Sequence, residues 1–269
     1  MSSLLITNLV YRKGIKMKII IAPAKIMKID RDSFPVQSKP EFLTKTRILE
    51  HFLKSRTKEH LDTLWHASQK VTEQGILQLK NMDLDDRLTP AILAFSGIQY
   101  QYMAPDIFTQ PALDYIQKNL RILSGFYGIL RPFDGVCPYR LELNTKMIGF
   151  RDYSLYHFWG DDIANSLFKE DDIVINLASK QYMRLIKPYL NEKRRMITID
   201  FQELKNGEWK TVGVHAKMAR GEMVRFMAEN QIKNPADLRD FHDFEFQFEP
   251  EVSSDDHYIF RTAFDFSQR

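Results

Sequence analysis

The sequence predicts an α/β protein built as a single mixed-sheet domain flanked by helices, and three observations lead to this fold class. Short apolar runs of strand length alternate along the chain with segments in which apolar residues recur every three or four positions, as in helices. No Gly/Ser-rich linker and no internal repeat interrupts the 269 residues. Near the end of the chain, paired segments of alternating polarity are typical of hairpins, which argues against a purely parallel sheet.

The first half of the chain begins with a buried strand. Residues 18–22 form a continuous apolar run bounded by Pro23, and residues 121–123 form a second strand that leads into a glycine-rich loop. Residues 91–95 form a short apolar element. Helical spacing, together with the first-turn proline Pro111, predicts the helices between these strands. These helices are 41–58, 69–82 and 111–119.

The second half contains one more buried strand, at 172–176, and two expected hairpins. The first hairpin turns at Asn206-Gly207, a dipeptide that favours tight turns. It joins strands at 196–200 and 209–214, and a terminal hairpin joins 244–248 to 257–261. Ser179 is a candidate N-cap for a helix that extends to Lys187. The other expected helices are 152–168 and 215–230.

Composition places the chain among ordinary globular proteins, with 44% hydrophobic and 27% charged residues. No apolar run is long enough to cross a membrane. The single cysteine, Cys137, excludes an internal disulfide and fits a reducing, cytoplasmic location. Cys137 is either a redox sensor beside two arginines or a buried bystander.

In residues 1–16 the basic residues follow the apolar ones, the reverse of the order in a secretory signal peptide. We therefore expect these residues to be an extension outside a domain of residues 17–269.

The charges are unevenly distributed along the chain. The formal net charge is +3, and residues 240–269 hold eight acidic and two basic residues, a net charge of −6. The remainder therefore carries +3 − (−6) = +9. A basic body with an acidic end suggests an anionic partner such as a nucleotide or a nucleic acid.

The glycine-rich loop at 123–142 is the strongest candidate for an anion site. Gly125 and Gly128 allow tight turns or a close approach to a ligand, and nearby prolines stiffen the loop that carries Arg131 and Arg140. Arginine presents a planar fork that suits phosphate or carboxylate. The alternative is structural, with the glycines in turns and the arginines paired with Asp134 and Glu142.

Polar residues in four loops are expected to converge, because ligands of open α/β sheets bind beyond the carboxyl ends of the strands. Lys217 and Arg220 are expected where a strand gives way to a helix, whose amino terminus favours anions. The expected site comprises Lys25, Ser124, Gly125, Tyr127, Gly128, Arg131, Tyr139, Arg140, Ser179, Lys217 and Arg220. The sequence lacks the spacings of phosphate-loop, dinucleotide and zinc motifs, so no metal, no cofactor and no catalytic residue are assigned.

Several motifs in order resemble the YaaA peroxide-stress family, from Met17 to the C terminus. They are residues 17–25, 123–132, 138–142, 158–160, 175–179, Tyr182, 216–221, Met223, Arg225 and 229–230. The resemblance implies a cytosolic bacterial protein, induced by hydrogen peroxide, that limits damage by lowering free intracellular iron. It also implies a positively charged cleft beside a helix-hairpin-helix-like element that binds double-stranded DNA. Here that element would extend from the Pro111 helix through the turn at Gly125 and Gly128.

Two functions follow as hypotheses. The first is a peroxide-stress protein whose basic cleft binds double-stranded DNA non-specifically through its phosphates. The second is an enzyme that acts on a small phosphorylated or carboxylated metabolite in the same cleft, with a site formed by Lys25, Tyr127, Arg131, Arg140, Lys217 and Arg220. Both require an anionic partner and neither requires a membrane.

Overall fold

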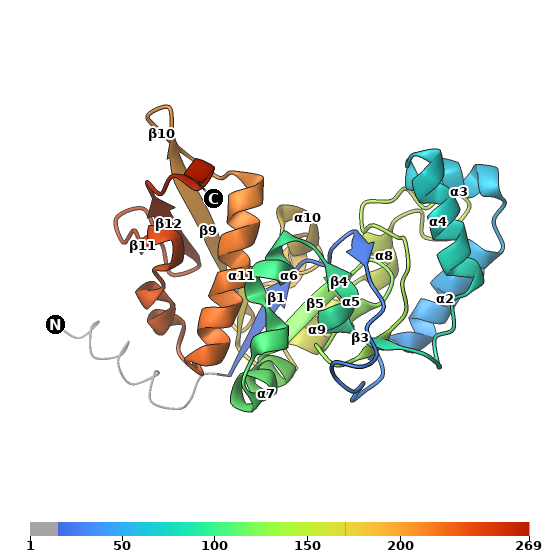
Figure 1. Cartoon of the computed structure of the whole chain (residues 1–269), viewed down its shortest axis with the longest axis horizontal. Helices are drawn as coiled ribbons and strands as arrows, with labels where there is room; N and C mark the ends of the chain where they lie inside the picture. The colour runs from blue at the N-terminus through green and yellow to red at the C-terminus, as the bar shows by residue number, and fades with distance from the viewer. Residues whose placement is uncertain (1–15, 170, 269) are drawn as a thin grey trace.

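The computed structural model describes residues 16–169 and 171–268, and a mixed sheet runs through its centre (Figure 1). Eight strands form this sheet in the order β11-β12-β9-β8-β1-β5-β6, with β10 paired to β9 in the described part of the chain. The strands are β1 Met17–Ile21, β5 Leu120–Ser124, β6 Gly128–Leu130, β8 Ile173–Leu177, β9 Arg195–Lys205, β10 Glu208–Lys210, β11 Gln247–Phe248 and β12 His257–Thr262. Strands β12, β9, β8, β1 and β5 are parallel, and the other three pair antiparallel. The mixed sheet is therefore confirmed.

The direction of winding reverses at β1. From β1 the chain moves to β5 and β6 on one side, and it then returns to β8, on the other side of β1, before continuing outward to β9 and β12. At such a reversal the loops that leave neighbouring strands diverge and open a crevice at the carboxyl ends. The segments after β1 and β8 therefore flank the natural ligand position of this sheet.

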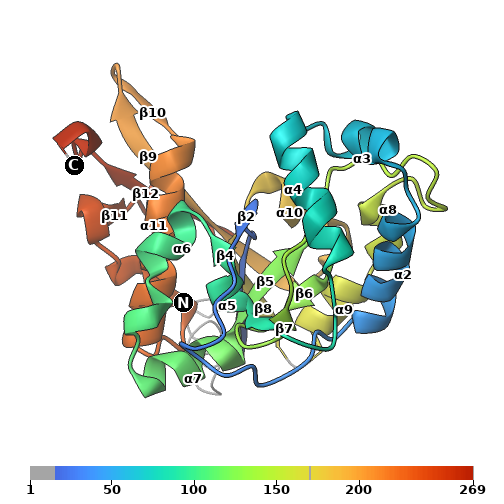
Figure 2. The same cartoon turned by 45° about the vertical axis from the view of Figure 1, so that its right-hand side comes forward.

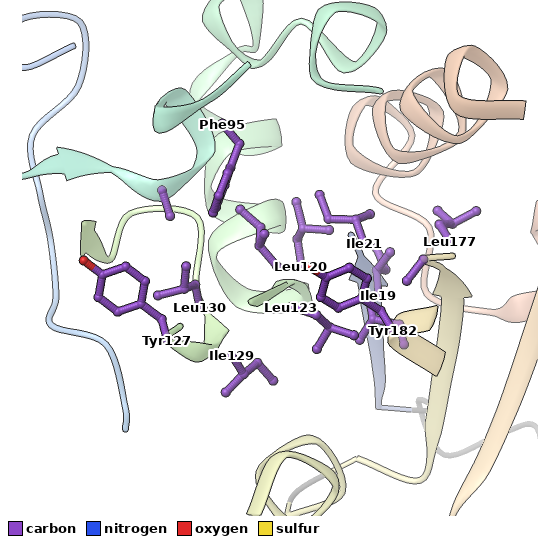
Figure 3. Close-up of a cluster of buried hydrophobic side chains, with 14 of the residues drawn as sticks. Ile19, Ile21, Phe95, Leu120, Leu123, Tyr127, Ile129, Leu130, Leu177 and Tyr182 are labelled. Atoms are coloured by element: carbon purple, nitrogen blue, oxygen red, sulfur yellow. The ribbon is translucent and has the colours of Figure 1, made fainter. Parts of the chain in front are cut away.

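The central strands are hydrophobic because the sheet is covered on both faces. All five residues of β8 are buried, as are all but one of those in β1. Figure 3 shows Ile19 and Ile21 of β1 among leucines of β5 and β6, with Tyr182 on one side of the cluster and Tyr127 on the opposite side.

Helices α6, α7 and α11 cover one face of the sheet, with α6 beside α11 in both views (Figures 1 and 2). Helices α2 to α4 form a separate group at the other end of the molecule (Figure 1). The helices are α2 Leu43–Lys54, α3 Lys58–Trp65, α4 Gln69–Lys80, α5 Ala91–Ala94, α6 Ile98–Met103, α7 Gln110–Asn119, α8 Leu155–Trp159, α9 Asp162–Leu167, α10 Lys180–Met183 and α11 Gly213–Glu229.

Two short strand pairs connect the loops on the α6 side of the sheet. Strand β2 Ile26–Met27 pairs with β4 Phe95–Ser96, and β3 Thr89–Pro90 pairs with β7 Gly135–Val136. Short 3-10 helices complete the described chain, at Pro105–Ile107, Lys187–Tyr189, Pro235–Asp240, Asp243–Glu245 and Phe266–Gln268. The pairing of β2 with β4 holds the segment after β1 beside the start of α6.

Most predicted helices and strands appear near their expected positions, and the differences are local. The strand expected over 209–214 is only β10, Glu208–Lys210, because the chain enters α11 at Gly213. The helix expected over 152–168 is two helices, because Gly160 leaves helical geometry with φ +53°. The helix expected from Ser179 to Lys187 is only the short α10, which gives way to turns in which Leu185 N–H and Ile186 N–H bond three residues back to Tyr182 and Met183. Lys217 and Arg220 do not lie at a helix amino terminus, because α11 already begins at Gly213.

The expected helix-hairpin-helix-like element is a β-hairpin in the structure. After α7 the chain continues into β5, turns, and returns as β6, with Ser124 paired to Gly128. Gly128 has φ +77°, and a Cβ there would lie 2.8 Å from the ring of Trp159. The indole N–H of Trp159 donates to the carbonyl of Gly125 at 3.0 Å. Gly128 thus serves the packing of Trp159, whereas a Cβ at Gly125 would lie 2.8 Å from the backbone oxygen of Leu141.

No helix among the described residues is both long enough and apolar enough to cross a bilayer. The predicted N-terminal extension, residues 1–16, falls almost entirely outside the described residues, which begin at Lys16.

Candidate functional site

A cavity of about 480 Å³ opens at the carboxyl edge of the parallel strands, where the winding reverses. Five segments that are distant in sequence line it. They are 22–26 after β1, 96–100 at the start of α6, 139–142, 179–182 after β8, and the face of α11 that carries Lys217 and Arg220. We call it the strand-edge cavity.

Six of the eleven candidate residues line the strand-edge cavity. They are Lys25, Tyr139, Arg140, Ser179, Lys217 and Arg220. The remaining five, Ser124, Gly125, Tyr127, Gly128 and Arg131, are not part of its lining. The strand-end loops therefore converge as expected, together with α11. The turn of the glycine-rich loop does not take part.

The turn of the glycine-rich loop has its polar groups satisfied internally. Ser124 is fully buried, and its Oγ accepts hydrogen bonds from the backbone N–H groups of Phe126 and Tyr127 at 3.2 and 2.9 Å. Tyr127 is buried beside Cys137, whose backbone N–H donates to the Tyr127 hydroxyl at 3.1 Å. Because these groups bond within the protein, the turn offers no free N–H from Phe126 or Tyr127 to a phosphate.

Arg131 is exposed, directly follows β6 and lies outside the cavity. Its backbone N–H donates to the Asp134 carboxylate at 2.8 Å. The Ser38 hydroxyl donates to the same carboxylate at 2.5 Å. Burial raises the pKa of Asp134, and these hydrogen bonds act in the opposite direction. The stiffened loop around Arg131 is organised by Asp134.

Three hydrogen-bond donors in the cavity wall are buried and lack a partner within the described part of the protein. They are Gln99 Nε2, Arg140 Nε and Arg220 Nε. The three side chains come from α6, the 139–142 segment and α11, and all of them line the cavity. Buried donors in folded proteins are nearly always paired with protein or water, so these three are available to whatever occupies the cavity.

Arg220 is the most strongly perturbed cation of the cavity. Burial lowers the pKa of its guanidinium below the usual value, and the negative charge of Asp200 partly opposes this. Lys217 lies three residues earlier on the same face of α11 and is exposed. Helix α11 therefore presents one recessed and one exposed cation to the cavity.

The mouth of the cavity carries an ion pair. Lys25 Nζ lies 2.9 Å from Glu142 Oε1, which joins the loop after β1 to the 139–142 segment. The Lys25 side chain is 70% exposed and that of Glu142 is 32% exposed. A pair this open to water contributes little to stability, so both groups can exchange partners when an anion arrives.

Two tyrosine hydroxyls in the wall are engaged by the protein. Tyr100 donates to the carbonyl of Ala22 at 3.0 Å and so fixes the loop after β1. Tyr139 OH lies 2.7 Å from Ser124 Oγ. Burial raises the pKa of both phenols, so they remain neutral.

Sequence reasoning missed Gln99 and Tyr100, because α6 was not expected. The available signal was Ser96-Gly97 directly after the short apolar run at 91–95, which has the same pattern as the other strand-end loops. A Cβ at Gly97 would lie 3.1 Å from the Cβ of Ala24, so this glycine lets α6 begin against the loop after β1.

Together, the sheet and the cavity define an open α/β protein with a ligand-sized cavity at its topological switch point. The family described as peroxide stress protein YaaA matches residues 17–252. The chain belongs to this family.

Curated relatives match over nearly their whole length. A UPF0246 protein of Lactobacillus acidophilus is 86% identical over 252 residues, covering 94% of this chain and 100% of the relative. A UPF0246 protein of Lactobacillus helveticus is 85% identical with the same coverage. One from Agathobacter rectalis is 47% identical over 244 residues, covering 91% of this chain and 98% of the relative.

Proposed function

We propose that this chain protects bacterial cells from peroxide by binding a small anionic ligand in the strand-edge cavity. One observation carries the proposal: the Nε atoms of Arg140 and Arg220 are buried without an acceptor among the described residues. A buried donor atom without an acceptor costs the fold free energy. An anionic ligand supplies the missing acceptors and offsets that cost through charge-assisted hydrogen bonds.

The size of the cavity favours a small ligand over duplex DNA. A volume of about 480 Å³ lies within the range of small-molecule sites. A DNA duplex is too wide to enter such a cavity and would reach only its rim. The ligand is either held as an effector or converted, in which case the chain is an enzyme for a phosphorylated or carboxylated metabolite.

Double-stranded DNA is the second candidate partner, and the exposed lysines at the rim favour it. Lys25 and Lys217 are both exposed beside the cavity and can reach phosphates from outside. Such binding is non-specific, because lysine contacts with the phosphate backbone carry no base information. The two candidates therefore use different residues, recessed arginines for the ligand and exposed lysines for DNA.

The physiological outcome we propose is a lower level of free iron in the cytoplasm during peroxide stress. Membership of the YaaA peroxide stress family and the resemblance of the motifs support this step. Less free iron means less conversion of hydrogen peroxide into more damaging radicals.

The test is complementation of a peroxide-sensitive bacterial strain that lacks its own copy. Arg140→Gln and Arg220→Gln are compared with Arg131→Gln, a matched change at an exposed arginine outside the cavity. We expect both cavity variants to lose peroxide survival and the drop in chelatable iron, measured by electron paramagnetic resonance, while Arg131→Gln retains both. Full protection by the two cavity variants, at normal protein levels, contradicts the proposal.

A further inference from the structure

The buried polar atoms left without a partner in the strand-edge cavity are donors of three side chains. Gln99 is 7% exposed, and its Nε2 has no acceptor within the described chain, as is also true of Arg140 Nε and Arg220 Nε. The two guanidinium groups suit an anion, whereas the amide N–H of Gln99 is neutral and suits an uncharged acceptor such as a carbonyl oxygen or a ring nitrogen. A ligand that carries such an acceptor beside its anionic group can pair all three donors.

The position of Gln99 is fixed by the packing of two helices. A Cβ at Gly221 would lie 2.3 Å from the Gln99 carbonyl oxygen, so α6 and α11 approach as closely as their backbones allow. Gln99 therefore lines the cavity beside α11, the helix that carries Arg220. Arg140 lines it from the 139–142 segment. A preorganised amide of this kind confers specificity, because a ligand without the matching acceptor leaves the buried donor unpaired.

The remaining wall is formed largely by carbon surface. The hydroxyls of Tyr100 and Tyr139 bond to Ala22 and Ser124, so these residues contribute their rings to the wall instead of their hydroxyls. Phe126 stacks on Tyr139 with ring centroids 5.0 Å apart, which holds the Tyr139 ring in place. Fixed aromatic walls favour flat ligands, because flat rings make the most contact with them.

From these three observations we infer that the ligand is a planar aromatic or heteroaromatic ring that bears a carboxylate or phosphate group and has a separate acceptor for Gln99. The inference rests on the proposed function and specifies the chemical class of its ligand. Nucleoside monophosphates and aromatic carboxylates with a ring nitrogen or carbonyl both belong to this class. In either case the anion binds Arg140 and Arg220, and the ring lies against the tyrosine wall.

The experiment is isothermal titration calorimetry of the full chain with matched pairs of probes. AMP and UMP are compared with ribose 5-phosphate, which lacks the ring, and with adenosine, which lacks the anion. Nicotinate is compared with acetate, and inorganic phosphate serves as the isolated ion. We expect at least one ring-bearing anion to bind about tenfold or more tightly than its ring-free partner, since a good additional contact changes affinity by about this factor. A gain in affinity for AMP or UMP identifies the ligand as a nucleoside monophosphate, and a gain for nicotinate identifies it as an aromatic carboxylate.

Variants separate the inference from the proposed function. Gln99→Met keeps the side-chain length and removes the donor, and Gln101→Met changes an exposed glutamine of the same helix. We expect Gln99→Met to weaken the ring-bearing probe about tenfold, while ribose 5-phosphate and Gln101→Met change little. Arg220→Gln is expected to weaken every anionic probe.

The outcomes are distinct. If ribose 5-phosphate and acetate bind as tightly as their ring-bearing partners, or Gln99→Met has no effect, the ligand class is wrong and anion binding stands. If no anion binds at millimolar concentration, or Arg220→Gln changes nothing, both proposals are overturned.

Discussion

At the scale of single residues, Arg220 links the stability of the protein to the proposed ligand. Burial lowers the pKa of its guanidinium, and its Nε has no acceptor in the part of the chain that the structure describes. Binding-site residues commonly lower the stability of an unliganded protein, and the proposed function predicts such a cost for Arg220.

Replacing this charge by an apolar side chain of similar length is therefore expected to stabilise the protein. We expect Arg220→Met to raise the free energy of unfolding by about 1 kcal/mol, because it removes a largely buried charge whose Nε has no acceptor among the described residues. For a chain of this length that corresponds to roughly 2–4 °C in Tm. Differential scanning calorimetry measures the change, and the variant is expected to lose peroxide protection.

Arg225→Met is the matched control on the same helix. Arg225 pairs with Glu229 at 2.9 Å, one turn further along α11. Loss of this exposed pair is expected to lower stability by about 0.5 kcal/mol or less and to leave protection intact. A Tm for Arg220→Met well below that of the parent protein would mean that Arg220 is structural.

Cys137 is a buried thiol, and its surroundings argue against peroxide sensing. Burial raises its pKa, and Tyr127 OH lies 3.3 Å from its Sγ. The thiolate is the reactive form, so the native protein is expected to react slowly with Ellman's reagent and to react rapidly once unfolded in guanidinium. Cys137→Ser should protect cells as well as the parent does. Fast, complete labelling of the folded protein would reverse this view.

At the scale of elements, the contact between α6 and α11 sets the shape of the cavity. Gly221 sits at the point of closest approach, next to the backbone of Gln99 and Met103. The two helices contribute Gln99 and Arg220 to the cavity wall. Any residue larger than glycine must push them apart.

Gly221→Ala is therefore expected to be strongly destabilising. The added Cβ would lie 2.3 Å from one backbone atom and 2.9 Å from another, and backbone cannot move aside as a side chain tip can. We expect a loss of about 2–4 kcal/mol in chemical denaturation, in the range of core overpacking and backbone strain.

Gly213→Ala is the matched control at the start of the same helix. A Cβ there meets nothing within 4 Å among the described residues, so alanine should be neutral or slightly stabilising. Equal effects of the two substitutions would show that helix propensity dominates and that the close contact does not.

Strands were predictable from the sequence, and the membership of the site was predictable only in part. The strands expected at 18–22 and 172–176 are found within one residue of these bounds, and their apolar runs are buried, a pattern set by the local sequence. Arg131 and Arg140 have the same local signals of glycine and proline, yet only Arg140 lines the cavity. Which of them lines it depends on how distant segments pack together, and a single sequence does not encode such long-range packing locally.

At the scale of the whole molecule, the two candidate partners would contact different parts of the charge distribution. Cations line the cavity and its rim, whereas the last thirty residues are acidic, with a net charge of −6. DNA would contact the exposed lysines, and a small ligand would contact the recessed arginines.

The salt dependence of DNA affinity measures how much the exposed lysines at the rim contribute to DNA binding. If duplex DNA binds, log affinity should fall linearly with log salt, with a slope of about −0.9 for each phosphate neutralised. Changing both Lys25 and Lys217 to alanine should make the slope shallower by about 1.8. Fluorescence anisotropy with a labelled duplex measures this, and the double change of Lys70 and Lys80 to alanine on α4 is the control. A slope unaffected by the rim variant rules out this face as the DNA site.

The scattered origin of the cavity wall has a consequence for the life of the protein in the cell. Lys25 and Arg220 are separated by 195 positions, so the ribosome completes one wall long before the other. At about 5–20 residues per second this interval is roughly 10–40 s. For that interval a nascent chain contains the loop after β1 and α6 but no arginine of α11. Protection by newly made protein thus begins only when nearly the entire chain has been translated and folded.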